Sequence, residues 1–242
     1  MNILTLLVLA IAPGLFWLWY FYRRDKLEPE PRHLVIKIFV WGVLIAIPVV
    51  IVQLFFDWLP ALMLFVVVAP VTEEYAKYWV VRHGVYNHAE FDEPMDGIVY
   101  AAAAALGFAS IENVGYLLDA YFGEPAVIDG AATSTTEAVL TLFVLRSLLS
   151  VPGHALWASL SGYALGVSKF LPKAQSAGLI RKGLLLAMLS HGIFNGLLVI
   201  SPWLALGLLI AVPLSWRMTS RRIRAAIASS PHAVSSDSSD SA

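Results

Sequence analysis

Long runs of apolar residues, separated by short polar stretches, extend along almost the whole chain. A helix that crosses a membrane needs about 20 mainly apolar residues. Segments of this kind are found at about residues 2–22, 34–56, 60–81, 96–118, 138–167, 179–200 and 202–217. Because a helix satisfies its own backbone hydrogen bonds in lipid, we predict an all-α fold, a polytopic transmembrane helical bundle of about seven spans.

Two of these segments are expected to be irregular. Segment 138–167 is longer than a bilayer requires, and Pro152-Gly153 is expected to kink it. Segment 202–217 is short and contains Pro213, so it is expected to form a half-span or a kinked helix.

Composition supports a membrane protein. The chain is 59% hydrophobic and 14% charged, with a mean hydropathy of +0.74, whereas soluble domains have about 45–50% apolar and about 25% charged residues. A formal net charge of -1 gives no support for a nucleic-acid partner. The absence of cysteine excludes disulfides, thiolate catalysis and cysteine-ligated zinc.

The distribution of Lys and Arg predicts the orientation in the cell membrane. Basic residues occur in loops 23–33 and 168–182 and in segment 217–224, whereas loop 119–137 has acidic residues and no Lys or Arg. The positive-inside rule then places the N-terminus outside and the C-terminus in the cytoplasm. No basic residue precedes the first apolar run, which continues to Tyr22, so we expect a retained span rather than a cleaved signal.

Two regions are expected along the chain. Residues 1–228 are predicted to form a single transmembrane domain, and residues 229–242 a Ser-rich cytoplasmic tail without apolar content, which is typical of disorder. No internal repeat is evident, although many transporters are built from repeated halves.

The adjacent Glu73 and Glu74 lie within apolar segment 60–81. An ionised carboxylate near the bilayer centre costs at least about 2.5–3.5 kcal/mol, so a purely structural role for the pair is hard to justify. Lys77 is one helical turn from Glu73 and can pair with it. Glu74 lies about 100° around the helix and can face a different neighbour.

Later spans carry further polar groups. Glu112 and Asn113 lie in segment 96–118, His154 in segment 138–167, and His191 and Asn195 in segment 179–200. Small residues recur every four positions in the same spans and allow helices to approach closely. We therefore expect one shared cavity, in which Asn195 orients His191 or a bound group. Its predicted members are Glu73, Glu74, Glu112, His154 and His191.

The depth of Glu112 creates a difficulty for a shared cavity. Glu112 lies about 24 Å from the start of its predicted span, further than the other polar groups lie from the same side. Either the span begins later than residue 96 or the helices are staggered, and the first option is favoured. Asp96 is predicted to be a carboxylate at a helix N-terminus.

Two histidines with one or more glutamates can bind a divalent metal such as zinc. Such a metal lowers the pKa of bound water to about 7, and a glutamate can act as general base. A Glu–His set can also activate water without metal. Both routes lead to amide hydrolysis. The alternative from another class is a proton- or ion-coupled transporter that uses the same Glu and His residues, and a third is a membrane scaffold.

Several motifs, taken in order, resemble the PrsW family of intramembrane proteases. The segment Pro70-Val-Thr-Glu-Glu-Tyr-Ala-Lys77 resembles its EExxK motif. Further blocks that resemble the family are Glu28-Pro-Glu-Pro31, Met95–Tyr100, Gly107–Asn113, His154 and His191–Asn195. PrsW proteins are similar to a wider group that includes CAAX-type prenyl endopeptidases and Abi-like proteins. The prenyl endopeptidases carry a histidine where this chain has Glu112, which favours PrsW over the prenyl branch.

The resemblance implies an intramembrane endopeptidase of the glutamic or metallo type, acting on a membrane-associated protein in the lipid bilayer. Family members are associated with cleavage of a membrane-spanning anti-sigma factor. The resemblance implies catalytic roles for Glu73, Glu74, Glu112, His154 and His191. It implies metal ligation by His154, His191 and Glu112, with Lys77, Asn113 and Asn195 in support.

Overall fold

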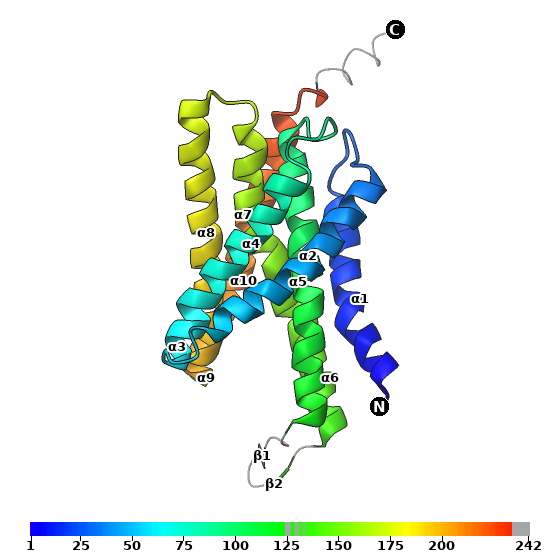
Figure 1. Ribbon diagram of the computed structural model, residues 1–242, viewed down its shortest axis with the longest axis vertical. Coiled ribbons are helices and arrows are strands. Elements are labelled where there is room, and N and C mark those ends of the chain that lie inside the picture. Colours follow the sequence, from blue (N-terminus) through cyan, green and yellow to red (C-terminus); the bar gives the residue numbers. More distant parts are fainter. Residues whose placement is uncertain (124–126, 129–130, 133, 234–242) are drawn as a thin grey trace.

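The computed structural model describes residues 1–123, 127–128, 131–132 and 134–233, and helices form most of it (Figure 1). Residues Val127–Ile128 (β1) and Ala131–Ala132 (β2) form a short antiparallel pair. Two π-helical turns are η1 (Leu64–Val68) and η2 (Arg146–Ser150). The α-helices are α1 (Ile3–Tyr22), α2 (Arg32–Leu54), α3 (Ala61–Met63), α4 (Ala69–Gly84), α5 (Pro94–Phe122), α6 (Thr135–Leu145), α7 (Val151–Ser168), α8 (Lys173–Val199), α9 (Pro202–Ala205) and α10 (Leu208–Ala228).

Within the described residues, 6 helical segments are long and apolar enough to cross a membrane. They correspond to all the predicted spans except segment 60–81. That segment is also helical, but it is divided into α3, η1 and α4, and Glu73, Glu74 and Lys77 lower its hydropathy. The prediction of an all-α, multi-pass membrane bundle is confirmed.

The ends of the helices gather into two groups (Figure 1). The α1–α2, α4–α5 and α7–α8 connections lie at one end of the bundle, together with the C-terminal end of α10. The N-terminus, α3, α9 and the β1–β2 pair lie at the other end. Connections that alternate between two ends are what a polytopic membrane protein requires.

Helix α5 lies at the centre and packs against α1, α2 and α7. Its predicted small-residue face, Ala101, Ala105 and Ala109, is buried. A Cβ atom added at Gly162 of α7 would lie 2.2 Å from the carbonyl oxygen of Gly97 on α5, so only hydrogen fits between the two backbones. Small side chains therefore allow the close packing that brings the polar spans together.

The variant Gly162→Ala tests this packing. We expect it to lower the free energy of unfolding by about 1–3 kcal/mol, because its new methyl group would overlap the α5 backbone. Thermal unfolding of the full-length protein in detergent measures the loss. Gly178→Ala is the matched control, since no atom lies within 4 Å of an added Cβ there. Equal midpoints for the two variants would contradict the packing described.

Both π turns end just before a proline. Pro70 is the second residue of α4 and Pro152 the second residue of α7. Proline has no backbone N–H and its ring clashes with the preceding turn, so a regular α-helical ladder cannot continue through these positions. The irregularity predicted at Pro152-Gly153 therefore takes the form of η2. Such wide turns often mark functional sites.

Two boundaries differ from the prediction. Helix α5 begins at Pro94, so the expectation that this span begins after residue 96 is wrong, and the helices are staggered instead. Helix α10 continues to Ala228, well beyond the predicted end at 217, with Pro213 inside it. In the predicted disordered tail, residues 234–242 lie outside the described residues.

Candidate active site

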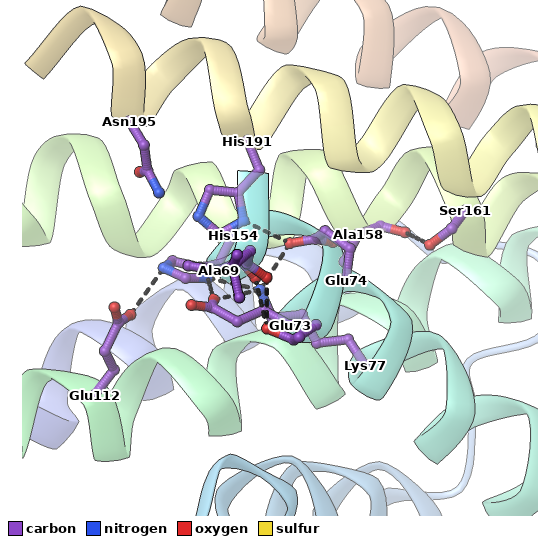
Figure 2. Close-up of polar contacts among 12 residues, drawn as sticks. Ala69, Glu73, Glu74, Lys77, Glu112, His154, Ala158, Ser161, His191 and Asn195 are labelled. Atoms are coloured by element: carbon purple, nitrogen blue, oxygen red, sulfur yellow. Dashed lines mark hydrogen bonds and ion pairs between the residues drawn. The ribbon is translucent and has the colours of Figure 1, made fainter. Parts of the chain in front are cut away.

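Helix α4 buries three charged side chains, which are drawn in Figure 2. The Lys77 ammonium lies 2.7 Å from Glu74 Oε1 and 3.4 Å from Glu73 Oε2. The sequence left open which glutamate Lys77 would hold; its ammonium contacts both and lies closer to Glu74. The two carboxylates differ in their access to open space, because Glu73 lines the cavities described below and Glu74 is fully buried.

The His191 ring on α8 is held from two sides. Its Nδ1 lies 3.0 Å from Glu74 Oε1, and its face stacks on Trp157 with ring centroids 4.3 Å apart. An ionised carboxylate can only accept, so Nδ1 carries the proton and donates to Glu74. The lone pair of the neutral ring is then on Nε2, where it can bind a metal.

The His154 ring on α7 uses both of its nitrogen atoms. The Lys77 ammonium donates to Nδ1 over 2.9 Å, and Nε2 lies 3.0 Å from Glu112 Oε2. This pattern requires the tautomer that is protonated on Nε2, with Nε2 donating to Glu112. His154 and His191 therefore each donate one ring N–H to a carboxylate. In metalloproteins, that arrangement orients a histidine whose other nitrogen binds the metal.

Arg146 joins the site through Glu112. Its guanidinium donates to Glu112 Oε2 over 3.1 Å and to Asn113 Oδ1 over 2.5 Å, and the Asn113 amide donates to the carbonyl of Ala10. Arg146 was not predicted as a site residue. A single arginine inside apolar segment 138–167 was a signal for it, because an unpaired charge there is costly. Asn113 links α5 to α1 and to Arg146.

Asn195 has a different partner from the one expected. Its amide donates to the carbonyl of Phe65 in η1 over 2.9 Å, and the partner that holds His191 is Glu74. The π turn shifts backbone bonding by one residue, so the donor for the Phe65 carbonyl would be Pro70, which has no N–H. The Asn195 side chain supplies the missing donor at the edge of the site.

Three of these side chains can converge on one metal ion. Glu73, His154 and His191 each offer a ligand atom within 4.8 Å of the others, and all three are buried. The predicted set was Glu112, His154 and His191. Glu73 takes the place of Glu112 in the convergent group, because Glu112 Oε2 bonds to His154 and Arg146. Two histidines and one glutamate are an established ligand set for catalytic zinc.

Two cavities reach this group from different sides. One, of about 400 Å³, is lined by Glu73, His154, His191 and Asn195 and extends between α4, α8 and η2. The other, of about 560 Å³, lies between α2 and α5. Glu73 and Glu112 line both. The five predicted site residues are therefore brought together in one place, beside two cavities.

The sequence pattern of the family described as "PrsW family intramembrane metalloprotease" matches residues 30–218. The chain belongs to the PrsW family. It is 36% identical over 200 residues to "Protease PrsW" of Geobacillus kaustophilus, covering 81% of this chain and 80% of that protein. It is 32% identical over 220 residues to "Protease PrsW" of Bacillus subtilis, covering 86% of this chain and 89% of that protein. No solved structure matches the chain.

PrsW membership confirms an intramembrane protease whose substrate is a protein in the membrane. The family description also names a metalloprotease, which agrees in chemistry with the convergent Glu73, His154 and His191. Nothing in these relationships favours the transporter alternative.

Trp157, which stacks on His191, is a site residue that the sequence did not predict, since a tryptophan in an apolar span carries no distinguishing signal.

Proposed function

We propose that this PrsW protein is a metal-dependent endopeptidase that cleaves a membrane-associated protein, with residues 1–228 as its single protease domain. The observation that carries the proposal is the pairing of each histidine with its own carboxylate, His154 with Glu112 and His191 with Glu74. Glu73 completes a His₂Glu donor set. Histidines that donate a ring N–H to a carboxylate are typical of metal sites.

The proposed metal ligands are His154, His191 and Glu73. The donors suit a cation, since Glu73 Oε2 and His154 Nδ1 already lie beside the Lys77 ammonium. Zinc is the divalent ion that this ligand set favours. When bound, it supplies a water of lowered pKa and polarises a carbonyl group. Glu74 would hold His191 in position, and the Lys77 ammonium, which contacts His154 Nδ1 and Glu73 Oε2 in this structure, would give up these contacts to the ion.

Glu112 is the proposed general base. Its carboxylate lines both cavities and its Oε2 is anchored by His154 and Arg146. The other oxygen, Oε1, takes a proton from the attacking water and returns it to the departing amine nitrogen. The attack on the peptide carbonyl carbon forms a C–O bond, and collapse of the tetrahedral species breaks the C–N bond.

The proposed substrate is a single-span membrane protein, and the resemblance to PrsW makes an anti-sigma factor the first candidate. The cavity between α2 and α5 is mainly apolar and includes Ile47, Val50 and Phe108 beside the two glutamates. Such a lining suits a partly unwound segment of a transmembrane helix.

Reconstituted protein should cleave an anti-sigma factor of this kind. The double variant Glu73→Ala, Glu74→Ala should not cleave it, although it should insert into the membrane normally. Cleavage by the double variant would refute the assignment.

The proposed orientation has the N-terminus outside and the C-terminus in the cytoplasm. Loops 23–31 and 169–172 carry basic residues and lie at the same end as the C-terminal end of α10 (Figure 1). Basic residues favour the cytoplasmic side.

Single-cysteine labelling tests this orientation cleanly, because the chain contains no cysteine. In intact cells, Asp57→Cys is expected to react with a membrane-impermeant maleimide and Glu90→Cys to react only after the membrane is opened. Both side chains are exposed, so accessibility differs only through the membrane. The reverse pattern would invert the proposed topology.

A further inference from the structure

A second cluster of acidic side chains is buried at the end of the bundle where α1, α2 and α5 meet. Asp25 and Glu30 come from the α1–α2 connection, and Glu93 and Asp96 from the start of α5. Their exposed fractions are 4%, 3%, 1% and 1%, respectively. Asp96 lies 16 residues before Glu112 on α5, or about 24 Å along the helix, so the cluster is separate from the candidate active site.

The carboxylates converge closely. Asp25, Glu93 and Asp96 each offer an oxygen within 4.8 Å of the others. Part of the cluster is fixed by ordinary hydrogen bonds. Asp96 Oδ2 accepts from the backbone N–H groups of Asp92 and Glu93 over 2.6 and 2.7 Å, which confirms its predicted role at a helix N-terminus. These bonds fix the Asp96 carboxylate in place.

Several of the remaining oxygens have no hydrogen-bond donor. Both oxygens of Asp25, Oε2 of Glu93 and Oε1 of Glu30 are buried without a partner in the described part of the chain. Glu30 lies outside the convergent group, and Tyr100 orients it by donating to its Oε2 over 2.5 Å. An unpartnered buried carboxylate oxygen is costly, and three side chains of the cluster carry one or two of them.

Across residues 1–123 and 134–233, no Lys or Arg forms an ion pair with any of the four acids, although Lys169 attracts Asp96 and Glu30 from a longer distance. The nearby Lys169 ammonium donates instead to the backbone carbonyls of Tyr86, His88 and Phe91. Burial and the negative charges of Glu93 and Asp96 raise the pKa of Asp25 to about 8. The site therefore needs protons or a cation.

We propose that Asp25, Glu93 and Asp96, with Glu30 beside them, bind one hard divalent cation of the Ca²⁺ or Mg²⁺ type. All the donors are carboxylate oxygens, which these ions prefer, and no histidine takes part. A cation there links the α1–α2 connection to the N-terminus of the central helix. It stabilises the fold at this end and takes no part in the hydrolysis.

The test uses full-length protein purified in detergent and freed of metal with a chelator at neutral pH. Bound Ca²⁺ and Mg²⁺ are measured separately by equilibrium dialysis, and the thermal midpoint is followed with each ion. We expect one ion per chain and a higher midpoint. Asp25→Asn should weaken binding by more than the 10–100-fold that loss of an outer partner costs. Glu90→Gln, an exposed acid in the neighbouring α4–α5 connection, should bind as the wild type does.

Two results would overturn the proposal. One is wild-type protein that binds neither ion and has the same midpoint in chelator, in which case the carboxylates share protons. The other is full binding by Asp25→Asn. Retention of the ion by His154→Ala, His191→Ala protein distinguishes this site from the candidate active site, so failure of either proposal leaves the other standing.

Discussion

Glu112→Gln is expected to reduce the rate of cleavage by about 10²–10⁴-fold while the protein keeps its bound metal. The glutamine side-chain amide has the shape of the carboxylate. Its oxygen can still accept the hydrogen bonds that His154 and Arg146 donate to Glu112 Oε2 over 3.0 and 3.1 Å. The amide cannot take a proton from water. Initial rates on a reconstituted membrane substrate, together with metal analysis of the same samples, measure both effects.

The control for this variant is Glu137→Gln, which alters an exposed acid on α6 outside both cavities. It should cleave at the wild-type rate. If Glu112→Gln also retained most of its activity, the proton would have to be taken by another group, and Glu73 would be the first candidate because it too lines both cavities.

His191→Ala is expected to remove both the metal and the activity. It deletes one of the convergent ligands and leaves Glu74 Oε1 with Lys77 as its remaining partner. Loss of an outer partner alone costs about 10–100-fold in metal affinity, so loss of a ligand should cost more. Metal content after dialysis and cleavage of the same substrate provide the two readings.

His33→Ala is the control for His191→Ala, since His33 is exposed at the start of α2 and is not one of the convergent ligands. It should retain metal and activity. A His191→Ala protein that lost its metal yet cleaved normally would favour the glutamic mechanism, in which a Glu–His set activates water without metal.

Charge inside apolar segments was the feature that made the site predictable from sequence. Glu73, Glu74 and His154 each lie in a run that would otherwise cross a membrane, and the cost of burying them indicated a shared polar site. Small residues at four-residue intervals indicated that the helices could approach closely. Membership of the PrsW family followed from the order of the same motifs.

The pairing of side chains across helices could not be predicted. Which carboxylate faces which histidine depends on helix stagger and rotation, and both are altered by the π turns that precede Pro70 and Pro152. Because the π turn shifts backbone hydrogen bonding by one residue, the Phe65 carbonyl lacks a backbone donor and accepts from the Asn195 side chain instead. Arg146 was overlooked for another reason, since its partner, Glu112, lies on a different helix.

The most direct test of a metal-dependent site is the metal content of active, full-length protein, combined with anomalous X-ray density at the cluster. We predict one divalent ion per chain beside Glu73, His154 and His191, with activity lost on chelation and restored by zinc. Fully active protein that contains no metal would contradict this prediction.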